Sequence, residues 1–242
     1  MDGVRGVYMN PWKDISLSDY EKHMSLENVK QLQVLNQLMK RQFGVYEDFR
    51  RETKIYTEFE GFAMILGVAG GNGLEHITAE LYEKIYAVDI NADYLAAVKE
   101  RFSDIGGKLE CLELDLITEY DKLPKADYLI ADLLVEYIGY ETFQKVIKKV
   151  GPEQISCVIQ INPEAGPLSE WVSESPYLHA FDGLDQVHHQ MDAVHLCRAL
   201  KEIGYDEIPE SVISVPLPNG KSLQLIDFAL PFQRIVQKYR YS

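Results

Sequence analysis

Three aspartates and a run of glycines are the residues whose types and spacing point most directly to chemistry. Asp89 and Asp132 each follow a short apolar run that is typical of a buried strand, and Asp115 follows the expected strand 109–114. Earlier in the chain, the apolar residues 62–66 lead into residues 67–73, which include four glycines. Glycines let a ligand approach the main chain, and the N–H groups of such a turn bind polar atoms of the ligand. The pattern predicts a nucleotide-type pocket.

The three aspartates stand at the ends of expected parallel strands, so we expect them at the same edge of the sheet. The carboxyl ends of parallel strands meet at one edge of a sheet, and ligands bind there where the strand order reverses. Asp89 lies 89 − 71 = 18 residues after Gly71, a spacing typical of an acid that binds ribose hydroxyls. A single aspartate in such a place is often a turn or helix cap. Three of them behind a glycine turn favour a binding site.

Two phosphate-binding patterns fit this turn poorly. A dinucleotide site usually shows G-x-G-x-x-G, but counting from Gly71 places His76 where the third glycine should stand. The G-x-x-x-x-G-K-[ST] pattern of a P-loop follows none of the expected strands. The sequence therefore argues against an NAD-dependent oxidoreductase and against a P-loop enzyme.

In this order and spacing, residues from about 60 to 230 resemble the class I S-adenosylmethionine (SAM)-dependent methyltransferases. The first motif of that family is an apolar run, an acid and G-x-G-x-G, and the matching positions are Gly67, Ala69, Gly71 and Gly73. Gly67 stands where the family has the acid, and Ala69 stands at the first glycine. We therefore expect the main chain, rather than an acidic side chain, to hold the methionine end of the cofactor.

The resemblance implies SAM as cofactor and S-adenosylhomocysteine (SAH) as product. It implies that Asp89 contacts the ribose, that Asp115 contacts the adenine, and that Asp132 lies beside the methionine moiety. The residues expected to bind the cofactor are Gly67, Ala69, Gly71, Asn72, Asp89, Ile90, Asp115, Leu116, Asp132 and Leu133.

Methyl transfer needs alignment of the acceptor atom, the methyl group and the sulfur, and it needs a base only if the acceptor arrives protonated. The segment after Asp132 resembles the substrate-facing loop of the family, so Glu136 and Tyr137 are the candidate catalytic residues, although neither is assigned as a base. The candidate substrate-binding residues are Tyr8, Trp12, Tyr20, Tyr137, Tyr140, Gln160 and Asn162.

Four Asp and His residues between positions 185 and 195 form a second candidate site. Asp185, His188, Asp192 and His195 fall at steps of three, four and three, so a helix there would carry them on one face. Such residues could ligate zinc or iron. We expect an ordinary solvated face and no metal, and a substrate role for His188 or His189 stays open.

Alternating elements must position these residues. The expected strands are 62–66, 85–88, 109–114, 128–131 and 155–161, and the expected helices are 74–84, 92–103, 141–150 and 185–203. A parallel, doubly wound α/β sheet follows from this alternation. Residues 211–215 and 222–230 predict a closing hairpin through the turn at 218–220. The resemblance implies a Rossmann-like seven-stranded sheet with order 3-2-1-4-5-7-6 and an antiparallel strand 7.

Residues 1–60 do not continue this alternation. Ser18 and Glu21 match a capping box, and an apolar stripe predicts a helix from Ser25 to about Phe43. We expect residues 1–60 to form a helical cap or lid over the crevice and residues 61–242 to form the catalytic domain. The helix could pack on the domain and cover the crevice at once.

Composition narrows the class of partner. The formal net charge of −14 repels phosphate backbones, so we expect no nonspecific binding to nucleic acid. No apolar run reaches the length of a membrane span, and the first residues do not begin a signal peptide, so we expect no membrane association and a cytoplasmic location. The three cysteines form no C-x-x-C pair and predict reduced core thiols.

Two functions remain open. The first is an enzyme that uses SAM to methylate a small molecule. The second is a catalytically silent module that binds SAM and acts through a protein partner, which the altered first motif would favour. The sequence does not decide the acceptor atom or the oligomeric state.

Overall fold

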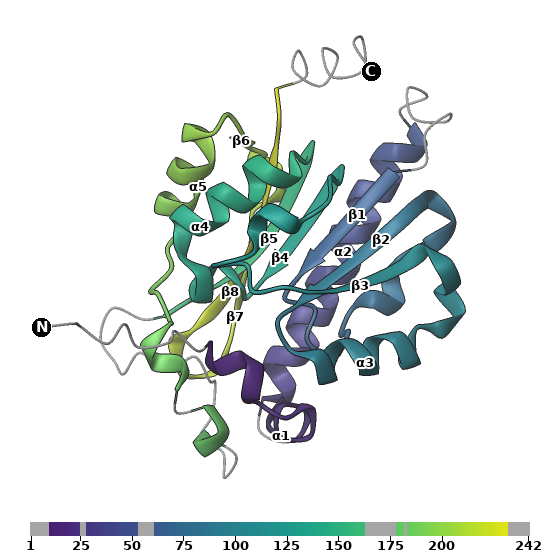
Figure 1. Ribbon diagram of the computed structural model, residues 1–242. Helices are drawn as coiled ribbons and strands as arrows, with labels where there is room; N and C mark the ends of the chain where they lie inside the picture. Colours follow the sequence, from purple (N-terminus) through teal and green to yellow (C-terminus); the bar gives the residue numbers. More distant parts are fainter. Residues whose placement is uncertain (1–9, 25–27, 53–60, 163–177, 182, 232–242) are drawn as a thin grey trace, which may run out of the picture.

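The structure, a computed structural model, describes residues 10–24, 28–52, 61–162, 178–181 and 183–231. The described strands form one sheet (Figure 1). Its strands are β1 (Gly61–Leu66), β2 (Tyr82–Asp89), β3 (Leu109–Glu113), β4 (Tyr128–Asp132), β5 (Gln154–Ile161), β6 (Asp206–Glu207), β7 (Ile213–Pro216) and β8 (Ser222–Ala229). The helices are α1 (Leu17–Lys22), α2 (Val29–Glu52), α3 (Ala92–Arg101), α4 (Val135–Val150) and α5 (Ala193–Glu202).

The sheet confirms the predicted topology. Its order is β3-β2-β1-β4-β5-β8-β6, with β7 paired to β8. The first five strands are parallel, and β8 runs antiparallel to β5. The antiparallel strand expected beside strand 5 is therefore β8, and β7 is its hairpin partner. The two-residue strand β6 is an addition that the sequence reading did not include.

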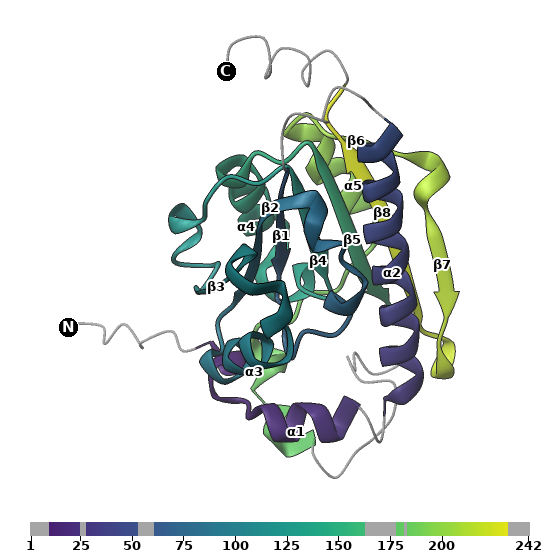
Figure 2. The same cartoon turned by 90° about the vertical axis from the view of Figure 1, so that its right-hand side faces the viewer.

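Helices cover both faces of the sheet (Figures 1 and 2). On one face, Phe43 of α2 and Val98 of α3 share a buried cluster with Ile65 of β1. On the other face, Phe143 of α4 and Leu196 of α5 share a cluster with sheet residues that point the opposite way. This alternation of side chains along each strand produces a three-layer α/β arrangement.

The helix expected over residues 74–84 is wrong. Two single 3₁₀ turns, at Leu74–His76 and Ala79–Leu81, lead directly into β2. The buried side chain of Leu74 joins the cluster that contains α2, and Glu47 of α2 accepts a hydrogen bond from Thr78 N at 2.8 Å. Because α2 already covers this part of the sheet, tertiary packing replaces the local helix.

The N-terminal helices differ in their limits. Ser16, not Ser18, caps α1, and its Oγ accepts a hydrogen bond from Asp19 N at 3.1 Å. Helix α2 begins at Val29 and continues past Phe43 to Glu52. Its extension packs on the sheet, since the ring of Tyr46 stacks on Tyr128 with centroids 4.0 Å apart.

Two later helices also start at other residues. Helix α4 begins at Val135 rather than near Glu141 and bends at Gly139, whose φ is 71°. Helix α5 begins at Ala193 rather than Asp185, because Asp192 caps it by accepting a hydrogen bond from His195 N. The remaining expected elements lie within a few residues of the observed ones.

The cysteine prediction holds in part. All three cysteines are free thiols, but only Cys157 is fully buried, while Cys111 and Cys197 are partly exposed. Among the described residues, no helix combines the length and hydrophobicity needed to cross a membrane.

Candidate functional site

The turn after β1 is held against β2 by its main chain. Gly67 N and Val68 N both donate to Val88 O, at 2.8 and 3.2 Å. Gly67, Ala69, Gly71 and Gly73 all have positive φ values. Ala69, with φ of 46°, adopts a conformation that is unfavourable for a residue with a Cβ. The chain therefore coils tightly at the carboxyl end of β1.

Two of these glycines are required by packing as well as by conformation. A Cβ at Gly71 would lie 2.6 Å from Phe102 Cε2, and one at Gly73 would lie 2.3 Å from Met39 Sδ. Helix α2 and the residue that follows α3 thus pack closely against the turn. A larger side chain at either position would displace the turn.

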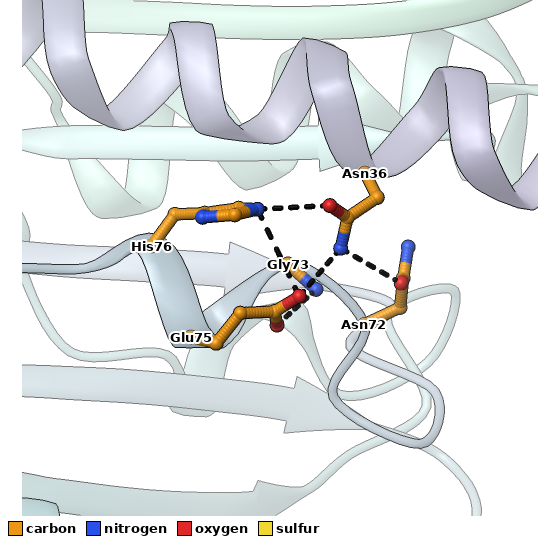
Figure 3. Close-up of polar contacts among 5 residues, drawn as sticks. All are labelled: Asn36, Asn72, Gly73, Glu75 and His76. Atoms are coloured by element: carbon orange, nitrogen blue, oxygen red, sulfur yellow. Dashed lines mark hydrogen bonds and ion pairs between the residues drawn. The ribbon is translucent and has the colours of Figure 1, made fainter.

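A polar cluster fixes the far side of the turn to α2 (Figure 3). The Nδ2 group of Asn36 donates to Asn72 Oδ1 at 3.2 Å and to Glu75 Oε1 at 2.6 Å. Glu75 Oε2 accepts from Gly73 N at 2.9 Å, and a ring nitrogen of His76 lies 2.9 Å from Asn36 Oδ1. His76, whose position argued against a dinucleotide site, thus helps to hold the turn against α2.

Asp89 joins the turn to the end of β2. Its Oδ2 accepts from Ala69 N and its Oδ1 from Asn91 N, both at 2.9 Å. The residue is 8% exposed, and burial raises the pKa of its carboxyl to about 6 although these hydrogen bonds oppose the shift. A carboxylate accepts about four hydrogen bonds, so each oxygen keeps capacity for a ligand.

A cleft opens at this edge of the sheet, with an empty volume of about 1280 Å³ that includes space open to solvent. Nine of the ten residues expected to bind the cofactor line it. They are Gly67, Ala69, Asn72, Asp89, Ile90, Asp115, Leu116, Asp132 and Leu133. The tenth, Gly71, borders a second hollow.

The carboxylate of Asp132 has protein partners. Its Oδ1 accepts from Gln42 Nε2 at 2.8 Å and from Val158 N at 3.0 Å, and burial raises the pKa of the carboxyl to about 7. Asp132 therefore ties β4 to α2 and β5 at the base of the cleft. The next residue, Leu133, has a φ of 52°, which turns the chain sharply after β4.

The candidate substrate residues divide by position. Trp12, Tyr20, Tyr137 and Gln160 line the cleft, as does the catalytic candidate Glu136. Tyr140 and Asn162 are not among the lining residues. The hydroxyl of Tyr140 binds the main chain of Asp192, and Asn162 Oδ1 accepts from Gln160 Nε2. Tyr8 lies outside the described residues.

The shared helical face expected for Asp185, His188, Asp192 and His195 is wrong. Only His195 lies within α5, where it pairs with the capping Asp192. His188 instead lines the cleft, with its ring 5.8 Å from that of Tyr137. Within the described part of the chain, no three His, Cys, Asp or Glu side chains gather in a way that could hold a metal ion.

Sequence reasoning missed Asn91 and Gln31. Asn91 Nδ2 donates to Trp12 O at 2.9 Å and Ile15 O at 2.8 Å, so it ties the N-terminal segment to the end of β2. Its place before a helix, where Asn is a preferred cap, was a usable signal. Gln31 lines the cleft from α2. A polar residue on an otherwise apolar helical stripe was the signal there.

Comparison with known proteins places the fold. No family model and no curated protein matches the sequence. Among solved structures, magnesium protoporphyrin IX methyltransferase (ChlM) from Synechocystis PCC 6803 is similar, with a TM-score of 0.58 at 9% identity, covering 94% of this chain and 100% of that chain.

Two further structures agree. A SAM-dependent methyltransferase from Leishmania major has a TM-score of 0.57 at 12% identity, with 90% of this chain and 80% of that chain covered. The methyltransferase domain of bacterial CtHen1 has a TM-score of 0.53 at 15% identity, with 80% and 98% covered. The chain therefore has the fold of the class I SAM-dependent methyltransferases.

Proposed function

We propose that this protein is a SAM-dependent methyltransferase that acts on a small molecule. The observation that carries the proposal is Asp89, a buried carboxylate at the end of β2 that is hydrogen-bonded to the glycine turn and lines the cleft. Similar proteins have been crystallised with SAM or SAH bound, and this chain offers the groups that such a cofactor needs.

The residues present fit the cofactor. Asp89 has spare acceptor capacity for the ribose hydroxyls, and Asp115 and Leu116 line the side of the cleft nearest β3, where the adenine is expected. The turn exposes main chain without long side chains, which suits the methionine end. When bound, SAM supplies an electrophilic methyl group on a positively charged sulfur.

The protein's contribution would be alignment and exclusion of water. Trp12 and Tyr20, from the N-terminal segment, line the cleft together with Tyr137. Trp12 and Tyr137 pack edge to face, with centroids 5.0 Å apart. This aromatic wall suits a small acceptor held against the cofactor. Glu136 and Tyr137 remain the candidates for handling a proton on the acceptor.

Calorimetry of SAM and SAH binding tests the proposal. We expect wild-type protein to bind both and Asp89→Ala to bind them at least about tenfold more weakly, because the ribose loses a charge-assisted acceptor. Asp93→Ala is the matched control, since Asp93 is a nearby exposed acid on α3. Circular dichroism checks that Asp89→Ala folds. If the wild-type protein bound neither SAM nor SAH at millimolar concentration, the proposal would be wrong.

The silent module remains the second candidate, because Gly67 replaces the acid of the family motif. Turnover separates the two functions. Release of SAH with a small-molecule acceptor supports the enzyme, whereas tight binding of SAM without turnover on small molecules or on a protein lysate supports the module.

A further inference from the structure

The cleft continues past the expected cofactor position toward β5. In the sheet, β5 lies on the opposite side of β4 from β1, so its end is remote from Asp89 and Asp115. The side chains that line this region, called the acceptor end below, are Trp12, Gln31, Glu136, Tyr137, Gln160 and His188.

Amide groups at the acceptor end form a directed chain. Gln31 Nε2 donates to Gln160 Oε1, and Gln160 Nε2 donates to Asn162 Oδ1, both at 3.0 Å. The main-chain N–H of Gln160 donates to Glu136 Oε1 at 2.8 Å. These bonds engage the main-chain N–H and the side-chain amide of Gln160. They also require that Gln31 directs its Nε2, and not its Oε1, toward Gln160.

The side-chain oxygen of Gln31 takes no part in these amide hydrogen bonds. Gln31 is 3% exposed, and its Oε1 has no hydrogen-bond partner among the described residues. A buried carbonyl oxygen without a donor lowers the free energy of unfolding, because its lost hydration is not replaced by a hydrogen bond. Gln31 lines the cleft, but its Oε1 is closed to solvent, so a ligand that brings an O–H or N–H group must move the atoms that cover this oxygen and would then remove the cost.

The charges around the cleft select against anions. At the acceptor end the lining carries the carboxylate of Glu136, with Asp132 at the base of the cleft, and the described lining of the whole cleft contains no lysine or arginine. An anionic ligand would lose its hydration there without gaining a lysine or arginine partner from the described lining. A neutral ligand avoids this cost, and a cation gains attraction from the carboxylates and the aromatic faces.

We propose that the acceptor is a neutral or cationic molecule with a flat apolar body, whose hydroxyl or amine N–H donates to Gln31 Oε1. This inference rests on the proposed function, because it assigns the occupant of the same cleft. Gln31 acts here in specificity, and the aromatic wall of Trp12 and Tyr137 contacts the body of the acceptor.

A charge-matched series tests the proposal. Tyramine, tyrosol and para-hydroxyphenylacetate share a phenol ring and carry an ammonium, a hydroxyl and a carboxylate. Their binding is measured by ligand-observed NMR on wild-type protein, both with saturating SAH and without it. We expect tyramine and tyrosol to bind at least about tenfold more tightly than para-hydroxyphenylacetate, because only para-hydroxyphenylacetate is an anion and the described lining offers it no lysine or arginine.

Variants at Gln31 separate recognition from folding. Gln31→Leu should weaken tyrosol about tenfold, because the acceptor oxygen is lost. Gln33→Leu, an exposed position on the same helix, should have no effect. Gln31→Glu keeps an acceptor and adds a negative charge, so it should raise the preference for tyramine over tyrosol, a response that a folding defect does not produce.

Three results would overturn the proposal. They are equal binding of the carboxylate, unchanged binding by Gln31→Leu, and absence of binding by all three compounds to the wild type. Because SAH binding is measured in the same samples, its failure counts separately, against the proposed function.

Discussion

At the scale of single residues, Asp89 combines two tasks. It accepts hydrogen bonds from Ala69 N and Asn91 N, which shape the turn, and it lines the cleft where a ribose is expected. Both tasks favour its ionised form, while burial opposes ionisation and raises its pKa from 3.8 to about 6. The site is therefore sensitive to pH near neutrality.

The affinity for SAH should fall as the pH decreases through about 6, because protonation of Asp89 removes the acceptor that the ribose needs. The stability of the free protein responds in the opposite sense. A raised pKa means that ionised Asp89 costs folding free energy above pH 6, and this cost disappears as the pH falls toward 3.8. Calorimetry and thermal melting across this range measure the two effects.

Asp89→Asn supplies the comparison, since Asp132, with a pKa near 7, titrates in the same range. The difference between wild type and Asp89→Asn isolates the contribution of Asp89. An identical pH profile for both proteins would show that Asp89 is not the group responsible.

At the scale of elements, Asn91 connects three parts of the molecule. Its Oδ1 caps α3 by accepting from Asp93 N and Tyr94 N, and its Nδ2 donates to the main chain of residues 12–15. The N-terminal segment that carries Trp12 and Ile15 is thus joined to the chain next to Asp89 by this side chain. Helix α2, by contrast, belongs to the core of the sheet.

Asn91→Asp separates the two roles. Aspartate caps a helix as well as asparagine does, so α3 should keep its start. The new carboxylate has no donor for the carbonyls of Trp12 and Ile15, so residues 10–16 should exchange amide hydrogens faster and SAH should dissociate faster. Hydrogen exchange and stopped-flow release measure these effects.

Asn91→Ala removes both roles and should cost about 1–2 kcal/mol more stability through the lost cap. Equal hydrogen exchange of residues 10–16 in Asn91→Asp and in the wild type would mean that other contacts hold this segment.

At the scale of the whole molecule, the net charge of −14 dominates long-range interactions. We expect no change in the fluorescence anisotropy of a labelled single-stranded DNA or double-stranded RNA when protein is added at low salt, where electrostatic binding is strongest. Binding that weakens as salt is added would contradict this expectation and reveal a local basic surface.

Much of the fold could be predicted because strands and their order depend on local pattern. The strand patterns before Asp89, Asp115 and Asp132 placed three strand ends at one edge of the sheet, and the hairpin identified the antiparallel strand. The sequence pattern wrongly predicted a helix over residues 74–84. Helix α2, which comes from an earlier part of the chain, covers this part of the sheet instead. Local propensity gives way to tertiary packing in such cases.

Less of the site could be predicted. The lining role of the strand-end residues followed from topology, but the partners of each side chain did not. Nothing in the sequence shows that Gln42 would reach Asp132 or that Tyr140 would bind Asp192 rather than line the cleft. Such contacts depend on how α2 and the segment before α5 approach the sheet, which pattern alone does not determine.

The central place of β8 affects the order in which the sheet can be completed during synthesis. This strand pairs with β5 along its full length, from Gln154 with Ala229 to Ile161 with Ser222, and it also holds β6 and β7. A nascent chain that has not yet reached residue 222 therefore carries β5 as an open, apolar edge on an otherwise formed parallel sheet. Such edges pair with other chains. We therefore expect a chain that lacks β8 to aggregate more readily than the complete sheet.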